Sequence, residues 1–166
     1  AENHMAKTEI IRTVKKLQRY ISSAFIIDST HMMCRAGHIS KRVQAICDAL
    51  LLHPIIMLRN SKMVVSGVEM GSFPHVARRY IRKVFANTRN IDKRILFITY
   101  SGMEGESLRL VQDLVRQYCP FARVYVQKAS SSITCNCGPR SFGLLFMRVN
   151  GVEVSFSEAS RPQAVE

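Results

Sequence analysis

The feature that most constrains the fold of this chain is a regular alternation between helical patterns and short apolar runs. Apolar residues spaced three and four apart predict amphipathic helices at 7–21, 73–87 and 104–118. Apolar runs too short for a helix predict buried strands at 24–27, 95–99 and 124–126. Chains that alternate in this way fold as α/β layers, so we expect one α/β domain over residues 6–156.

Two hairpins are predicted as well, and they exclude a purely parallel sheet. Strands at 55–58 and 63–65 flank a turn at 60–61, and strands at 142–149 and 152–156 flank the Asn-Gly pair at 150–151. We therefore expect a mixed β-sheet packed against helices. A further helix should begin after Ser40, end near Leu52 before Pro54, and bury one stripe, made of Val43, Ile46, Cys47, Leu50 and Leu51.

The ends of the chain and its cysteines suggest where the protein works. Residues 1–5 read as an expression remnant and residues 157–166 as a loose tail. No segment approaches the roughly 20 apolar residues of a membrane span, and the N-terminus lacks a signal-peptide layout. Five cysteines without a disulfide spacing pattern indicate reduced thiols, so we expect a cytoplasmic protein.

The formal net charge of +12 raises the question of an anionic partner. Basic residues cluster on the predicted helices 7–21 and 73–87; on the second helix they are Arg78, Arg79, Arg82 and Lys83. These four could contact an acidic protein or a nucleic acid, or they could form an ordinary solvated helix face. The chain has neither an aromatic RNA-binding pattern nor a recognisable DNA-binding motif, which makes nucleic acid the weaker choice.

The segment 130–143, with the sequence SSSITCNCGPRSFG, is the most unusual part of the chain. We expect a polar loop over 129–137, a Gly-Pro turn and then an apolar strand. Small hydroxyls and backbone amides in such a loop can hold an anionic head group. A plain connection between two elements would have the same composition.

Other kinds of chemistry find little support. Cys135 and Cys137, even with Cys34 and His38, lack the spacing of a metal site. Asp28, Ser29 and His31 are not accompanied by a nucleophile-elbow motif, and no phosphate-binding glycine loop is present. We therefore expect no catalytic residues, no metal and no cofactor.

Several segments, taken in chain order, resemble motifs of the DegV family of fatty-acid-binding proteins. Residues 133–146 look like its late His-Thr-Gly-Pro-Gly motif, and residues 33–40 look like its Leu-x-x-Gly-Gly-Arg-Ile-Ser turn. Residues 25–30 are similar to the family's strand after the first helix, and residues 52–56 to the stretch before its hairpin. The resemblance covers about residues 10–148 and places this chain in the C-terminal half of such a protein.

This resemblance implies a fold and a ligand. Family members are two-domain α/β proteins that bury one fatty acyl chain between the domains, and some serve as the acyl-carrying subunit of a fatty acid kinase. The chain would then be a fragment of a longer protein without its N-terminal domain. It would bind a long-chain fatty acid without being an enzyme, and a kinase-type subunit would be its protein partner.

The family's ligand motifs are altered in this sequence. Asn136 stands where the family has histidine, Cys137 where it has threonine, Arg140 where it has a second glycine, and His38 where it has arginine. The family's basic Lys-x-Arg pair after the hairpin falls near Gly67, Val68 and Glu69, where this chain has no basic residue. Asn136 can still donate a hydrogen bond to a carboxylate, and Arg140 could supply charge. The resemblance thus implies the lipid-binding residues His38, Asn136, Cys137, Gly138, Pro139 and Arg140.

Three functions remain open at this stage. The first is a lipid-binding domain of the DegV type. The second is a degenerate module that has lost its ligand, as the substitutions at His38, Glu69 and Asn136 allow, and that mediates protein interaction. The third is a domain that binds nucleic acid or an acidic partner through the basic helix 73–87.

Overall fold

A computed structural model of the chain describes residues 6–59, 62–103 and 105–149. They contain a six-stranded sheet with the strand order β3-β2-β1-β6-β4-β5. β4 and β5 are parallel and the other neighbours are antiparallel, which confirms the mixed sheet. The strands are β1 (Ile21–Ile26), β2 (Leu52–Arg59), β3 (Lys62–Met70), β4 (Ile91–Ser101), β5 (Arg123–Lys128) and β6 (Ser141–Arg148).

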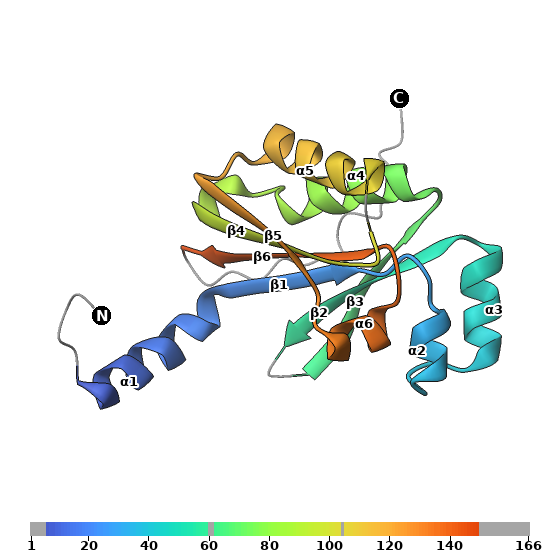
Figure 1. Cartoon of the computed structure of the whole chain (residues 1–166), viewed down its shortest axis with the longest axis horizontal. Helices are drawn as coiled ribbons and strands as arrows, with labels where there is room; N and C mark the ends of the chain where they lie inside the picture. Colours follow the sequence, from blue (N-terminus) through green and yellow to red (C-terminus); the bar gives the residue numbers. More distant parts are fainter. Residues whose placement is uncertain (1–5, 60–61, 104, 150–166) are drawn as a thin grey trace, which may run out of the picture.

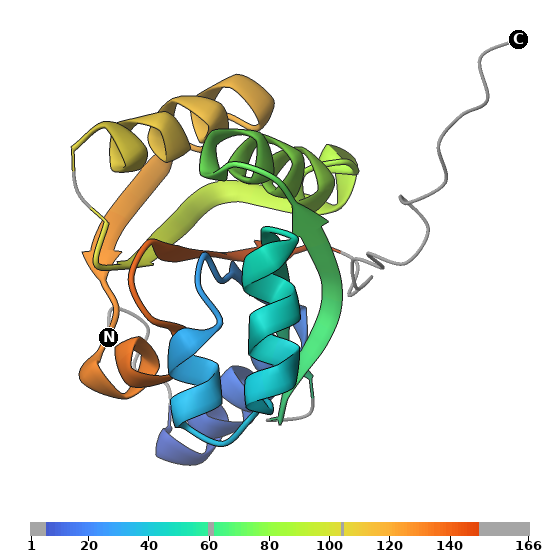
Figure 2. The ribbon, with the colours of Figure 1, turned by 90° about the vertical axis from the view of Figure 1, so that its right-hand side faces the viewer.

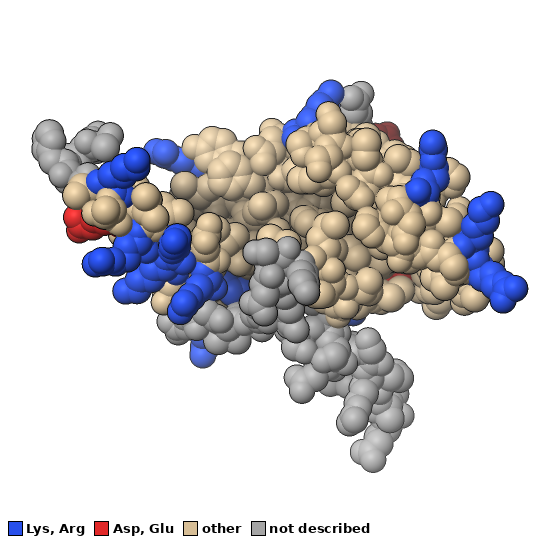
Figure 3. All heavy atoms as spheres, turned by 90° about the horizontal axis from the view of Figure 1, so that it is seen from below, with Lys and Arg blue, Asp and Glu red and all other residues tan. Residues whose placement is uncertain are grey.

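Helices lie on both faces of this sheet (Figures 1 and 2). One face is covered by α4 (Phe73–Val84) and α5 (Glu106–Tyr118). The other face carries α2 (His31–Arg35), α3 (Lys41–Ala49) and α6 (Ser131–Cys137), while α1 (Lys7–Leu17) projects beyond the start of β1. Short 3-10 turns at Gln18–Tyr20 and Thr88–Asn90 lead into β1 and β4. Figure 3 shows the face that carries α2, α3 and α6, and the middle of this face has few charged side chains.

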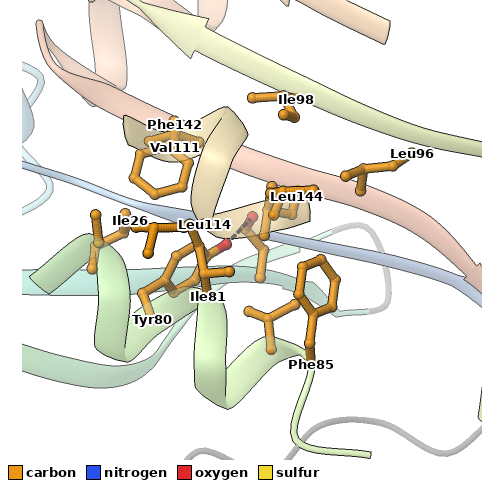
Figure 4. Packing of buried hydrophobic residues seen from close by; sticks show 14 of the residues in the cluster. Ile26, Tyr80, Ile81, Phe85, Leu96, Ile98, Val111, Leu114, Phe142 and Leu144 are labelled. Carbon is orange, nitrogen blue, oxygen red and sulfur yellow. Dashed lines mark hydrogen bonds between the residues drawn. The ribbon is translucent and has the colours of Figure 1, made fainter. Parts of the chain in front are cut away.

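The main hydrophobic core fills the layer between the sheet and the pair α4 and α5 (Figure 4). The rings of Tyr80 and Phe142 meet there edge to face, with centroids 5.4 Å apart. The hydroxyl of Tyr80 donates a hydrogen bond of 2.6 Å to the carbonyl of Ala24, so the buried polar end of this side chain is satisfied. Burial raises the pKa of Tyr80, because the charged phenolate would lose its hydration.

The expected inward faces of these two helices are confirmed. α4 ends at Val84, three residues earlier than expected, and α5 begins at Glu106 in the described part of the chain. Leu108 is only partly buried but packs against the core. The fully buried members of the two expected stripes are Val76, Tyr80, Ile81, Val84, Val111, Leu114 and Val115.

Two expectations, about the end of α1 and about the apolar stripe of α3, were wrong. The first helix ends at Leu17 instead of residue 21, because Ile21 already pairs with Met147 as the first residue of β1. Ser40 does cap α3, and its hydroxyl accepts a hydrogen bond of 3.3 Å from the amide of Val43. The apolar stripe of α3, however, is not buried, since no described element covers it: Val43, Ile46, Leu50 and Leu51 are all exposed.

The expected loop at 129–137 was also wrong, because residues 131–137 form α6. The hydroxyl of Ser130 accepts a hydrogen bond from the amide of Ile133 and thereby caps the helix. Contacts with α2 then support a segment whose composition is poor in strong helix formers.

Some expectations lie outside the described residues. These are the remnant at 1–5, the turn at 60–61, the second hairpin at 150–156 and the tail at 157–166. In the described parts of the chain, no helix is long and apolar enough to cross a membrane.

Candidate functional site

The sheet face that carries α2, α3 and α6 is only partly covered, and apolar side chains remain exposed on it. Leu58 at the end of β2 and Met63 and Val65 in β3 are each more than half exposed. On the parallel pair, the rings of Phe97 and Tyr125 stack with centroids 5.1 Å apart and are also accessible. An open apolar sheet face of this kind is suited to contact another apolar surface or a ligand.

The first of two cavities on this face lies between the sheet, α2 and α6, with a volume of about 400 Å³. Met33 and Ile56, both buried, form part of its wall. Two polar side chains, His38 and Asn136, also line it. The other lining residues are Ile27, Ile39, Met63, Val65 and Cys137.

The second cavity runs along the sheet face on the other side of α6 and measures about 510 Å³. Phe25, Leu58, Leu145 and Ile133 give it an apolar lining, and hydroxyl, amide and lysine side chains lie at its rim. Met63 and Cys137 line both cavities. The two cavities are therefore adjacent, with Met63 and Cys137 between them.

Gly143 makes room for one wall of the second cavity. It pairs with Phe25 across β6 and β1, and a Cβ atom at this position would stand 2.7 Å from Cδ1 of Phe25. No side chain could share this space without moving the ring. The glycine thus leaves room for the Phe25 ring, which lines the cavity.

His38 and Asn136, 98 residues apart in sequence, are hydrogen bonded in the first cavity. Nε2 of His38 lies 3.0 Å from Oδ1 of Asn136. The Nδ2 group of Asn136 donates a hydrogen bond of 2.8 Å to the carbonyl of Ser132, which fixes the amide so that Oδ1 faces the histidine. Nε2 of His38 therefore carries the hydrogen, and its Nδ1 remains for a ligand.

Cys137, Gly138 and Pro139 end α6 and turn the chain into β6. Cys137 is buried, and burial raises the pKa of its thiol. Gly138 has a φ of +73°, the left-handed region that favours glycine, and a Cβ there would lie 3.0 Å from Cγ of Met32. Among the described residues, no group of three His, Cys, Asp or Glu side chains is placed to hold a metal ion.

Arg140 points to a carboxylate of the chain itself. Its Nε and Nη2 atoms both lie 2.7 Å from Oδ2 of Asp28, a side chain that is 8% exposed. The other carboxylate oxygen, Oδ1, lies 3.5 Å from Nδ1 of buried His53. Nε2 of His53 in turn donates a hydrogen bond of 2.9 Å to the carbonyl of Gly71. The charge expected of Arg140 is thus already paired.

The four basic residues of α4 divide into two pairs. Arg79 and Lys83 reach down to Glu69 on β3, with N–O distances of 2.7 and 2.5 Å. Glu69 is only 5% exposed, so its two cations neutralise a buried carboxylate. Arg78 and Arg82, one turn apart, are exposed to solvent.

Sequence reasoning found the polar end of the site but missed most of its apolar walls. Phe25, Leu58, Met63 and Val65 were assigned to strands without a face. Their alternation with residues of the core, such as Ile26 and Met57, is the signal that could have placed them on the opposite face. Asp28 was considered only for hydrolase chemistry and not as a partner of Arg140.

Comparisons with known proteins agree with this fold. A family model described as "uncharacterised protein, DegV family" matches residues 1–149. A search of the curated proteins found no match to the chain.

Three similar solved structures illustrate the likeness in fold. The first is a DegV family protein from Eubacterium eligens loaded with heptadecanoic acid, with a TM-score of 0.72 at 16% identity, covering 88% of this chain and 52% of that one. The second is a fatty-acid-binding DegV family protein from Thermus thermophilus, with a TM-score of 0.68 at 23% identity, covering 89% and 52%. The third is the fatty acid kinase B3 protein of Streptococcus pneumoniae, loaded with linoleic acid, with a TM-score of 0.70 at 9% identity, covering 86% and 50%. The chain therefore spans about half the length of these relatives.

Proposed function

This chain belongs to the DegV family, and we propose that it is a non-catalytic domain that binds the alkyl chain of a long-chain fatty acid. The observation that carries the proposal is the pair of adjacent apolar cavities on the open sheet face, with the His38–Asn136 pair lining the first of them. The domain would supply one half of the site, because the relatives are about twice as long.

The apolar walls account for most of the expected affinity. Each methylene group that leaves water contributes roughly 0.8 kcal/mol, so an alkyl chain along Phe25, Met63 and Leu145 would be held by burial alone. Polar groups then fix the orientation of the ligand. A second domain that closes over the exposed residues Leu58 and Val65 would increase the buried area.

The polar residues near the first cavity would meet the carboxyl group. His38 donates to Asn136 through Nε2, which leaves its Nδ1 as the ring atom that would bond with the carboxyl group. Cys137 would form part of the wall beside it, Gly138 and Pro139 would shape the turn that follows, and Arg140 would act through its contact with Asp28. A glyceride or alcohol head group would use the same histidine as a hydrogen-bond partner.

The proposal can be tested by placing a charge in the apolar wall. Ile133→Asp puts a carboxylate in the second cavity, and Ile46→Asp makes the same change on exposed α3, outside both cavities. Because both isoleucines are partly exposed on helices, we expect both variants to fold. Titration with palmitic acid should show at least tenfold weaker binding for Ile133→Asp and wild-type binding for Ile46→Asp. Equal binding by the two variants would refute the site.

A second function, docking of an acidic protein partner on α4, is favoured by the exposed pair Arg78 and Arg82. Arg79 and Lys83 would hold the helix in place through Glu69. One relative is a fatty acid kinase B3 protein, so a kinase-type subunit is the partner class to consider. A nucleic acid would require the same charges.

Binding of poly-glutamate and of a random 20-nucleotide RNA distinguishes these partners. If the partner is an acidic protein, the wild-type chain should bind poly-glutamate. This binding should weaken in Arg78→Glu/Arg82→Glu and persist in the control variant Arg12→Glu/Lys15→Glu on α1. Preferential, strongly salt-dependent binding of RNA would favour the nucleic-acid alternative.

A further inference from the structure

We propose that Arg140 is a positioning residue, which through its ion pair with Asp28 fixes the turn at 138–140 and thereby holds Asn136 against His38 in the cavity. This inference deepens the proposed lipid-binding function and rests on it for its biological meaning.

The backbone of Arg140 adopts a conformation that its side chain disfavours. Its φ is +54°, in the left-handed region where residues other than glycine are uncommon. Gly138, two residues earlier, is also left-handed, so Pro139 lies between two left-handed residues. A residue with a Cβ persists in such a conformation only where the surrounding structure holds it.

The structure holds the turn from three directions. From the end of β1, Oδ2 of Asp28 accepts hydrogen bonds of 2.7 Å from both Nε and Nη2 of Arg140. From the loop after β4, the carbonyl of Gly102 accepts a hydrogen bond of 3.3 Å from the amide of Arg140. From α2, Met32 packs so closely on Gly138 that a Cβ there would lie 3.0 Å from its Cγ.

Asp28 is a firm anchor for this contact. Its side chain is 8% exposed, whereas that of Arg140 is 59% exposed, so the arginine bends back from solvent to reach a buried carboxylate. Oδ1 of the same carboxylate lies 3.5 Å from Nδ1 of His53, whose Nε2 is fixed by the carbonyl of Gly71. The anchor therefore lies just after β1 and is in contact with His53 of β2.

Two hydrogen bonds connect the turn at 138–140 to the first cavity. The hydroxyl of Ser141 donates a buried hydrogen bond of 2.7 Å to the carbonyl of Cys137, which joins the start of β6 to the end of α6. Asn136 precedes Cys137 and contacts His38 at 3.0 Å. A turn released from Asp28 would let the last turn of α6 shift and would lengthen that contact.

The test compares Arg140→Gly with Arg94→Gly. Arg94 also pairs with an aspartate, Asp92, but near the start of β4, and neither residue lines a cavity. Arg140→Gly removes the ion pair with Asp28, and because glycine adopts a φ of +54° without strain, a shift of the turn reports the loss of the ion pair. We expect the NMR signals of the Asn136 side-chain amide and the His38 ring to shift in the ligand-free Arg140→Gly protein, and to stay in place in Arg94→Gly and in the conservative Arg140→Lys.

A double variant separates positioning from simple charge burial. Asp28→Asn/Arg140→Gly leaves no unpaired buried carboxylate, so this double variant should fold. Its Asn136 signals should still be shifted, because the ion pair between residues 28 and 140 is absent. Palmitic acid should bind at least fivefold more weakly to both glycine variants than to Arg140→Lys. Wild-type Asn136 and His38 signals in Arg140→Gly, or their recovery in the double variant, would overturn the inference. Because these signals are read without ligand, a failure of lipid binding in the wild-type protein would count only against the proposed function.

Discussion

Nε2 of His38 lies 3.0 Å from Oδ1 of Asn136, although 98 residues of chain separate the two side chains. The contact connects the turn after α2 to α6 at the edge of an apolar cavity. It is the place where polar recognition and burial of an alkyl chain would occur together.

Loss of this contact should weaken binding more than folding. Asn136→Ala removes the hydrogen bonds to His38 and to the carbonyl of Ser132 at a partly exposed site. Loss of the bond to His38, worth about 1 kcal/mol, corresponds to roughly fivefold in affinity. Isothermal titration with palmitic acid should show this loss, with little change in the thermal unfolding midpoint. Asn87→Ala, an exposed asparagine outside both cavities, is the control and should bind normally.

The thiols should differ in reactivity according to burial. Cys135 is exposed, whereas burial raises the pKa of Cys119 and Cys137 above the usual thiol value of 9.0. At pH 8 a raised pKa means fewer thiolates, so iodoacetamide should label Cys135 first and the two buried thiols slowly. Labelling of the two buried thiols should rise as the pH approaches their raised pKa values. Peptide mass spectrometry measures each site.

Fatty acid should protect one of these buried thiols selectively. Cys137 lines both cavities and Cys119 lines neither. Added palmitic acid should therefore slow labelling of Cys137 and leave Cys119 unchanged. Equal protection of both thiols would indicate general stabilisation, and no protection would contradict the placement of the ligand beside Cys137.

The buried carboxylate of Glu69 should matter for stability. Glu69→Gln leaves Arg79 and Lys83 without their partner, and we expect the free energy of unfolding to fall by about 2 kcal/mol, less than for a fully buried pair because Arg79 is partly exposed. Urea denaturation measures the change. Asp113→Asn breaks an exposed pair with Arg116 and should cost about 0.5 kcal/mol or less.

Gly143→Ala tests the packing of the Phe25 wall. Because the new methyl group would stand 2.7 Å from Cδ1 of Phe25 and 3.1 Å from the carbonyl of Ala24, we expect destabilisation by about 1–3 kcal/mol and a displaced ring. Gly37→Ala provides a comparison without steric conflict, since nothing lies within 4 Å and only its φ of +78° disfavours the change, by about 1 kcal/mol. A smaller loss for Gly143→Ala than for Gly37→Ala would contradict this packing.

The sequence predicted the layered fold because its strongest signals are local. The stripes of α4 and α5 and the β2–β3 hairpin follow directly from spacing and turn residues. The α3 stripe was misjudged because spacing shows which side of a helix is apolar but not whether another element covers it. α6 was missed because capping by Ser130 and contacts with α2 outweigh the weak helix propensity of its residues.

The site was predictable only in part for a related reason. Asn136, Gly138 and Pro139 stand in a recognisable motif, but their neighbours come from β1, β2, β3 and α2. The pairing of Arg140 with Asp28 joins residues 112 apart in the chain, and no local pattern encodes such a contact. Long-range contacts of this kind follow from the strand order, which the sequence did not reveal.

The central claim is that this domain takes part in binding a fatty acyl chain. The most direct test is to extract the purified chain with organic solvent, together with any longer protein that contains it, and to analyse the extracts by mass spectrometry. The account predicts a stoichiometric long-chain fatty acid on the longer protein, and uptake of added palmitic acid by this chain. Extracts without any acyl chain, even after incubation with fatty acids, would mean that the DegV fold persists here without that ligand.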